Sequence, residues 1–268
     1  MISGKSLVSI ILTVAAYLTM ASPVASAQNA GRKTLYRPPA EVKLERLIRR
    51  RFPDFYGKSF PGEVLIVEKL YPVGWSKDGK LAYYLEPGDE ACGCYFARLA
   101  IKDLKSDAVL WQFDYDSSEL QDRLKKRTPE SLPSLWRYKR ELFSSKLREH
   151  GIIPQRRFAF LLFPANYMGD QLTADLKTTE TQGDRDYGII NGAVLQLASK
   201  QRGRKTIFEQ TSKPDEALPL DMKVLGYLRS PFEPRIAVIL IEVLRGYEGP
   251  PHVTHFDIVG ASLDGGFK

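Results

Sequence analysis

The spacing of apolar residues divides the chain into segments with different periodicities. Residues 7–20 form an almost continuous apolar run near the start. Apolar residues between 44 and 52 then recur at helical spacing, which predicts a short helix ended by Pro53. From residue 63 onward, runs rich in Val, Ile, Tyr and Phe alternate with Gly, Pro, Asp and Ser, a pattern typical of strands joined by turns.

The predicted strands share β-branched and aromatic residues bounded by turn-forming residues. They cover residues 64–70, 81–85, 95–101, 109–113, 158–163, 171–177, 188–198, 206–210, 223–228, 236–244 and 253–259. Short connections favour antiparallel pairing, and Lys77-Asp78-Gly79 is typical of a hairpin turn. We expect a long loop over the polar residues 178–187.

Residues 118–151 are the clearly helical region. A broad apolar face from 135 to 147 predicts an amphipathic helix that Ser134 caps and Gly151 ends, and prolines separate it from a short helix over 119–127. Because strands precede and follow this region, we predict a mainly β fold with α (α+β), built from mostly antiparallel sheets around a central helix.

Two segments look like diverged copies of one hairpin. Val73-Gly74-Trp75 is followed by Lys80–Leu85, and Leu225-Gly226-Tyr227 is followed by Arg235–Leu240. Each copy has a Gly-aromatic pair, a turn, and then a basic residue, an aliphatic residue, Ala and an apolar run. We therefore expect two related hairpin units. They lie either in a single β-rich domain over residues 41–268 or in two halves that the helical region divides.

Two resemblances follow from these motifs. Residues 74–80 resemble a strand-turn-strand motif in blades of TolB-like β-propellers, which usually carry Pro where Lys77 stands. A propeller repeats such a unit every ~40–45 residues. Here the second copy of the motif lies at Gly226, far beyond that spacing from Gly74, so a complete propeller is not expected. The Ser-Pro-Phe-Glu-x-Arg-Ile-Ala block at 230–237 is similar to a family of predicted secreted bacterial proteins of unknown function. That resemblance implies export and a β-rich fold, and it carries no catalytic residue across.

The first 27 residues have the pattern of a cleaved signal peptide. Lys5 precedes the apolar run, and Ala25-Ser26-Ala27 is typical of a signal peptidase site, so Ala27 and Gln28 flank the predicted cleavage. The alternative is an uncleaved anchor, but the run is shorter than the ~20 residues of a spanning helix. We expect a periplasmic or extracellular protein without stable membrane insertion, beginning with an extended or disordered lead-in over residues 28–40.

Charge changes this picture only slightly. The formal net charge is +7, and cleavage removes Lys5 from it. A basic excess favours an anionic envelope component or a protein as partner, and the exported compartment argues against nucleic acid. Basic residues cluster at 49–51, 125–127, 156–157 and 202–205, and such runs are usually solvated faces.

Cys92 and Cys94 are the two cysteines of the chain and lie in a predicted loop. In an oxidising compartment they favour a local disulfide, while free or intermolecular thiols and a catalytic or metal-binding role remain alternatives. His255 and Asp257 would share one face of a strand, which makes them weak metal-ligand candidates, whereas His252 would point to the opposite face. No catalytic residue, cofactor or cofactor-binding residue is predicted.

The residues therefore favour an exported, non-enzymatic protein that binds an envelope component, a polymer or a protein. One alternative is an exported hydrolase or redox enzyme with a site around Cys92, Cys94 or His255. Another is a structural subunit of an assembly. The sequence does not decide the oligomeric state.

Overall fold

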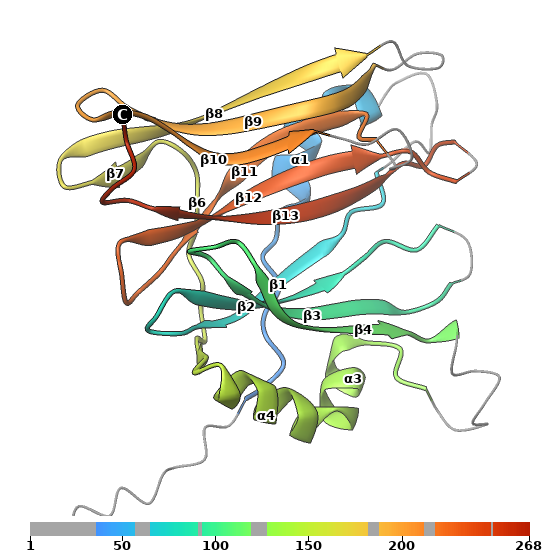
Figure 1. Cartoon of the computed structure of the whole chain (residues 1–268). Helices are drawn as coiled ribbons and strands as arrows, with labels where there is room; N and C mark the ends of the chain where they lie inside the picture. Colours follow the sequence, from blue (N-terminus) through green and yellow to red (C-terminus); the bar gives the residue numbers. More distant parts are fainter. Residues whose placement is uncertain are drawn as a thin grey trace, which may run out of the picture. The chain divides into compact units, whose positions relative to one another are not determined.

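Three antiparallel β-sheets are stacked with helices on one outer face (Figure 1). This computed structural model describes residues 36–56, 65–90, 93–118, 128–181, 188–211, 218–247 and 249–268. Residues 35–268 form one compact unit. The predicted mainly β fold with α is confirmed, with stacked sheets in place of propeller blades. The predicted signal peptide and its cleavage site, Ala27 and Gln28, lie outside the described residues.

Sheet 1 is five-stranded and lies next to the helices. Its strands, in spatial order, are β4 (Val109–Asp116), β3 (Phe96–Asp103), β2 (Lys80–Glu86), β1 (Lys69–Trp75) and β5 (Ile153–Pro154). The predicted turn at residues 77–79 joins β1 to β2, and Gly79 has the positive φ that this turn requires.

Sheet 2 is four-stranded and forms the middle β layer. Its strands, in spatial order, are β13 (Val253–Ser262), β12 (Arg235–Leu244), β11 (Asp221–Arg229) and β6 (Phe160–Leu161). Residues 236–243 of β12 are all buried, because sheet 1 covers one face and sheet 3 the other. This position explains why the β12 segment reads as a continuous apolar run instead of alternating.

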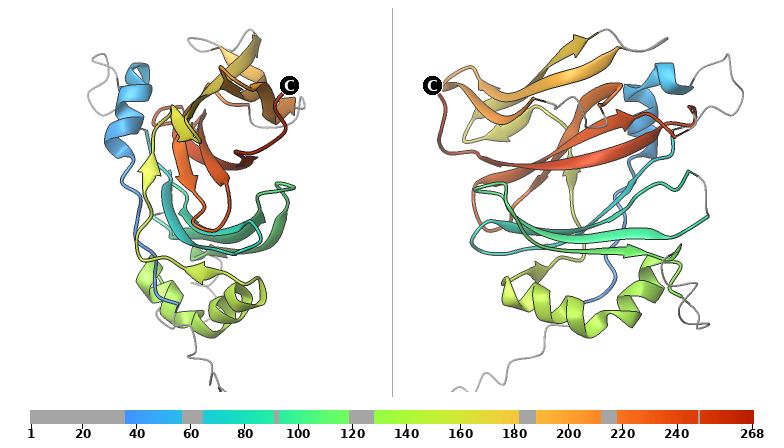
Figure 2. Two further views of the ribbon diagram at one scale, coloured as in Figure 1. Left: turned by 90° about the vertical axis from the view of Figure 1, so that its left-hand side faces the viewer. Right: turned by 45° about the vertical axis from the view of Figure 1, so that its right-hand side comes forward.

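Sheet 3 is four-stranded and has one face exposed. Its strands, in spatial order, are β10 (Gly203–Thr211), β9 (Ile189–Ser199), β8 (Asp170–Thr181) and β7 (Ala165–Tyr167). The edge-on view shows the layers in sequence: helices, sheet 1, sheet 2 and sheet 3 (Figure 2, left).

The helices occupy two places. The predicted first helix is α1 (Glu45–Arg51), followed by the 3₁₀ turn η1 (Pro53–Tyr56), and both pack at the side of sheets 1 and 2. The outer layer consists of α3 (Leu132–Tyr138) and α4 (Arg140–Glu149). Among the described residues, no helix is both long and apolar enough to cross a membrane.

Each interface between layers is filled by large apolar side chains. Trp136 of the helical layer packs on Tyr84 of sheet 1, and Phe143 packs on Trp136 and on Phe113 of the same sheet. Trp75 of sheet 1 lies in the core shared with sheet 2, and Leu195 of sheet 3 lies in the core between sheets 2 and 3. Burial of each such side chain contributes about 1.5–3 kcal/mol relative to an exposed one.

The two hairpin units are real structural equivalents. A register shift precedes Gly74 in β1 and another precedes Gly226 in β11. Each glycine also lies against a two-residue edge strand, and a Cβ atom there would collide with the carbonyl oxygen of Ile153 or Leu161. The same bulge and the same close backbone approach therefore explain why glycine precedes the aromatic residue in both copies.

Equivalent faces of the two units point in the same direction along the stack. In sheet 1, Ala82 faces the helices, whereas Trp75 faces sheet 2. In sheet 2, the corresponding Ala237 faces sheet 1, and Tyr227 faces sheet 3. The copies thus stack face to back: the Trp75 face of the first unit packs against the Ala237 face of the second.

Several predicted boundaries were wrong. The strand expected at 64–70 is β1 at 69–75, preceded by an isolated bridge at Ile66. The strand expected at 158–163 is reduced to β6, because pairing with β11 involves only two of its residues. Residues 178–181 continue β8 instead of forming a loop, since they pair with β9, and 182–187 lie outside the described residues.

The central helix also differs from the prediction. Ser131, not Ser134, is the N-cap, and the two serines form a reciprocal capping box. Pro133 lies in the first turn of α3, where a missing N–H costs nothing. The helix is divided at Lys139 into α3 and α4, and Gly151 follows with the expected positive φ. The helix predicted over 119–127 lies outside the described residues.

Candidate functional site

The cysteine loop lies between β2 and β3. Cys94 is disulfide-bonded, and its backbone N–H donates to the Asp89 carboxylate at 2.8 Å. Cys92 lies outside the described residues, so its pairing with Cys94 stays a prediction. The adjacent Tyr95 and the more distant Tyr71 both donate to the Glu86 carboxylate at 2.7 Å. Burial, together with this carboxylate, raises the pKa of Tyr71 and that of Tyr95, so both hydroxyls stay protonated as donors.

His255 and Asp257 lie on one face of β13, as predicted, and His255 is paired with a carboxylate from another segment. His255 Nδ1 is 3.4 Å from the buried Glu68 carboxylate, which also accepts the backbone N–H of Phe256 at 2.6 Å. The hydrogen bond to Glu68 raises the pKa of His255. Within the described ranges, no group of three His, Cys, Asp or Glu side chains could hold a metal ion.

Glu242 adds a buried carboxyl group beside this histidine. It lies directly opposite His255 in the β12–β13 register, and burial raises its pKa to about 7. The Glu242 Oε1 atom has no hydrogen-bond partner among the described residues. Glu68 therefore accepts from the backbone of β13, while burial makes the Glu242 carboxyl group harder to ionise than an exposed glutamate.

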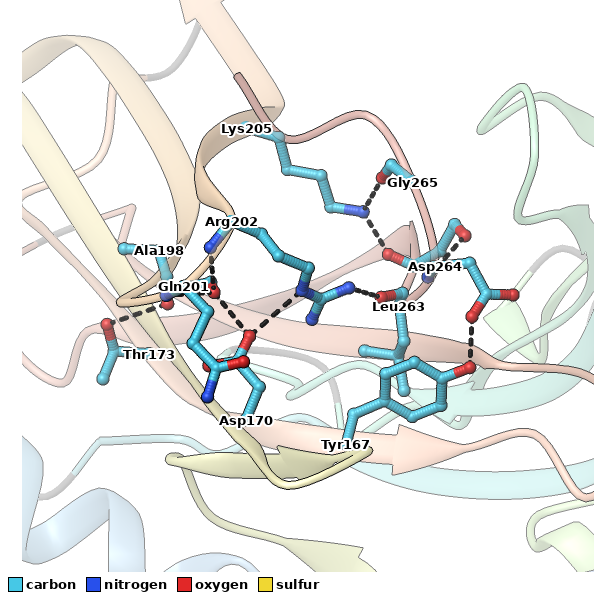
Figure 3. Close-up of polar contacts among 12 residues, drawn as sticks. Tyr167, Asp170, Thr173, Ala198, Gln201, Arg202, Lys205, Leu263, Asp264 and Gly265 are labelled. Carbon is cyan, nitrogen blue, oxygen red and sulfur yellow. Dashed lines mark hydrogen bonds and ion pairs between the residues drawn. The ribbon is translucent and has the colours of Figure 1, made fainter.

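The basic run at 202–205 is engaged in internal contacts (Figure 3). Arg202 Nε donates to the buried Asp170 carboxylate at 3.0 Å, and its Nη1 donates to the Leu263 carbonyl oxygen at 2.5 Å. Lys205 Nζ donates to the carbonyl oxygens of Ser262 and Gly265. The run is thus a solvated face only at the exposed Arg204, because Arg202 and Lys205 hold the C-terminal segment onto sheet 3.

Arginines that are remote in sequence form a crevice at the opposite end of the stack. Arg37 precedes α1, Arg137 is in α3 and Arg140 begins α4, and all three side chains are exposed. With Tyr36, Pro38, Pro133 and Trp136 they line a cavity of about 240 Å³, here called the Trp136 crevice. Tyr36 is positioned by two bonds: its hydroxyl donates to the Ile152 carbonyl oxygen at 2.8 Å, and its own carbonyl accepts from Trp136 Nε1 at 3.4 Å.

The Trp136 crevice has an excess of positive charge. In the described part of the chain, none of its three guanidinium groups makes an ion pair or a hydrogen bond. The walls between them are the rings of Tyr36 and Trp136 and two prolines. The arrangement is able to hold a negatively charged group at the rim and an apolar group against the walls.

Comparison with known proteins returned no matching family model, no matching curated protein and no matching solved structure. Sequence reasoning missed the Trp136 crevice, because its arginines come from segments about a hundred positions apart. The one available signal was the pair Arg137 and Arg140, whose spacing places both on one side of consecutive helices.

Proposed function

We propose that this chain is an exported, non-enzymatic protein that binds anionic phospholipid at the surface of the cell envelope through the Trp136 crevice. The observation that carries the proposal is a set of three arginines that have no ion-pair or hydrogen-bond partner among the described residues and that surround an aromatic, proline-walled cavity. A phosphate attached to an apolar chain has both features that this cavity complements.

The size of the Trp136 crevice supports a headgroup more than an enclosed small molecule. Its volume of about 240 Å³ lies below the ~300–1,000 Å³ of typical ligand pockets. The same helices expose Tyr138 and Leu142 to solvent. A basic helical face with exposed aromatic and aliphatic side chains is typical of proteins that lie on a bilayer surface.

Vesicle sedimentation tests the proposal. The wild-type mature chain is expected to bind phosphatidylglycerol vesicles and to bind phosphatidylcholine vesicles much more weakly. Each basic residue near an anionic surface contributes about 1 kcal/mol, so the double variant Arg137→Gln/Arg140→Gln is expected to bind roughly thirtyfold more weakly. Added inorganic phosphate distinguishes a lipid site from a site for the free ion. If the crevice is a site for free phosphate, a low concentration of phosphate should release the protein from the vesicles.

Lys200→Gln/Arg245→Gln is the matched control. Both residues are exposed and outside the Trp136 crevice, so the same two charges are removed elsewhere and binding should stay near the wild-type level. Equal losses in both double variants would show that net charge, not the crevice, drives binding. Absence of phosphatidylglycerol binding by the wild-type chain would reject the proposal.

Export is tested separately from binding. N-terminal sequencing of the protein recovered outside the cytoplasm is expected to begin at Gln28, because Ala25 and Ala27 occupy the small-residue positions of the predicted cleavage site. A recovered chain that retains residues 7–20 would instead indicate an uncleaved anchor.

A further inference from the structure

The outer edge of β8 is uncovered over a defined length. β7 pairs with β8 only from Asp170 to Leu172, and the register with β9 shifts between Thr179 and Glu180. Between these limits, residues 173–179 form a regular edge with no further strand beside it among the described residues. Uncovered regular edges have unpaired backbone N–H and C=O groups and tend to pair with another strand.

The sequence of this edge is complementary to itself. If two copies of residues 173–179 pair antiparallel about Leu176, Asp175 of each copy lies opposite Lys177 of the other, and Thr173 lies opposite Thr179. Directly opposed residues in an antiparallel pair have Cβ atoms about 4.5–5.5 Å apart, where opposite charges and Thr–Thr pairs are favourable. Lys177 is exposed and has no ion-pair partner in the described ranges, while Asp175 is 2.7 Å from Arg204.

The inner side of the same edge has room for an added strand. Ala174, Leu176 and Thr178 line a groove of about 420 Å³ between β8 and β11, with Met222 and Val224 on the opposite wall. The lining also contains the charged residues Arg51, Glu180, Asp221 and Lys223. In the pairing described, Leu176 of the second copy is next to Leu176 of the first. Its side chain would enter the groove and cover the apolar part of the lining, which Leu176 and Val224 provide, beside the charged residues of the same groove.

We propose that the mature protein forms a symmetric dimer in which β8 of one copy pairs antiparallel with β8 of a second copy about Leu176, so that two copies of sheet 3 become one continuous sheet. The centre of the self-complementary sequence coincides with the centre of the uncovered edge. A two-fold axis at Leu176 produces two identical Asp175–Lys177 contacts, as an interface between identical copies requires.

Two charge variants test the proposal by sedimentation velocity over a range of protein concentrations. Lys177→Glu creates an all-acidic edge and Asp175→Lys an all-basic edge, so each variant alone is expected to self-associate roughly tenfold more weakly than the wild type. An equimolar mixture of the two should form a heterodimer, because every 175–177 contact across it again joins opposite charges.

Several outcomes would overturn the proposal. They are a wild-type chain that stays monomeric at all concentrations, single variants that dimerise as well as the wild type, and a mixture of folded variants that remains monomeric. A second measurement reports the register: Leu176→Cys should cross-link to its counterpart under mild oxidation. Thr173→Cys should not, because it lies opposite Thr179. Equal cross-linking of the two would also reject the pairing.

Discussion

Two groups of basic residues at opposite ends of the stack have opposite electrostatic environments. Arg202 and Lys205 are close in sequence, yet both are engaged inside the protein, Arg202 by Asp170 and the Leu263 carbonyl oxygen and Lys205 by backbone carbonyl oxygens. Arg37 and Arg137 are far apart in sequence, yet they line one crevice with Arg140 and have no charged partner in the described ranges. A run of basic residues is therefore a poor indicator of a binding surface in this protein.

The aromatic surroundings of the two groups explain the difference. The Phe267 ring lies 4.4 Å from the Arg202 guanidinium carbon and 4.5 Å from the Lys205 amine, so the C-terminal segment covers both cations. Trp136, by contrast, is buried beneath its arginines and donates to Tyr36, which leaves the guanidinium groups outside. Cation–π contact stabilises the fold in the first group, and exposure leaves the second group available to a ligand.

The largest expected effect is on stability at Arg202. Arg202→Gln leaves the buried Asp170 carboxylate without its cation and removes the bond to Leu263, so the free energy of unfolding should fall by about 3 kcal/mol in urea titrations. Arg137→Gln, which breaks no hydrogen bond or ion pair among the described residues, should change it by less than about 0.5 kcal/mol.

Binding should show the reverse ranking. Under conditions where Arg202→Gln remains folded, its binding to phosphatidylglycerol vesicles should match the wild type, whereas Arg137→Gln/Arg140→Gln should lose binding and keep stability. Equal losses of stability in the two groups would show that the arginines of the Trp136 crevice also hold the fold, and the comparison would fail.

A smaller effect is expected from pH at Lys205. Burial, together with the nearby Arg202 and Arg235, lowers the pKa of Lys205 to about 8. Below pH 8 the amine is charged in both the folded and unfolded chains, and the cost of burying that charge is fully present. Between pH 8 and the ordinary lysine pKa, the folded chain releases its proton first, so stability should rise with pH.

Lys205→Met is the variant that isolates this titration. In this variant, the free energy of unfolding should no longer rise between pH 8 and the ordinary lysine pKa. The lost increase should be on the order of 1–3 kcal/mol, measured by denaturant titrations at fixed pH values. A wild-type profile that falls between pH 8 and 10 would contradict the assignment.

Local patterns predicted the secondary structure well where packing and local preference agree. The hairpin at residues 77–79 and the strands around 81–85 and 236–244 appear as expected, because turn chemistry and apolar runs are local properties. The predictions failed where pairing decided the outcome. Residues 178–181 are polar, but they continue β8 because β9 supplies their backbone partners.

The candidate site followed the same division. Placing His255 and Asp257 on one face needed only the alternation of a strand, and that prediction was confirmed. Glu68 and Glu242 could not be assigned to the same place from the sequence, because one precedes β1 and the other is in β12. The Trp136 crevice was missed for the same reason.

The sequence by itself determined the fold class, the two related hairpins and the glycines that begin them, because each depends on residues within a few positions of one another. The predicted signal peptide also rests on local pattern alone. Only the tertiary structure decided that the hairpins stack face to back, that Arg202 and Lys205 make internal contacts, and that Arg37 is brought beside α3. Those outcomes depend on which surfaces, distant in sequence, pack together and exclude water. The local spacing of apolar residues does not specify that packing.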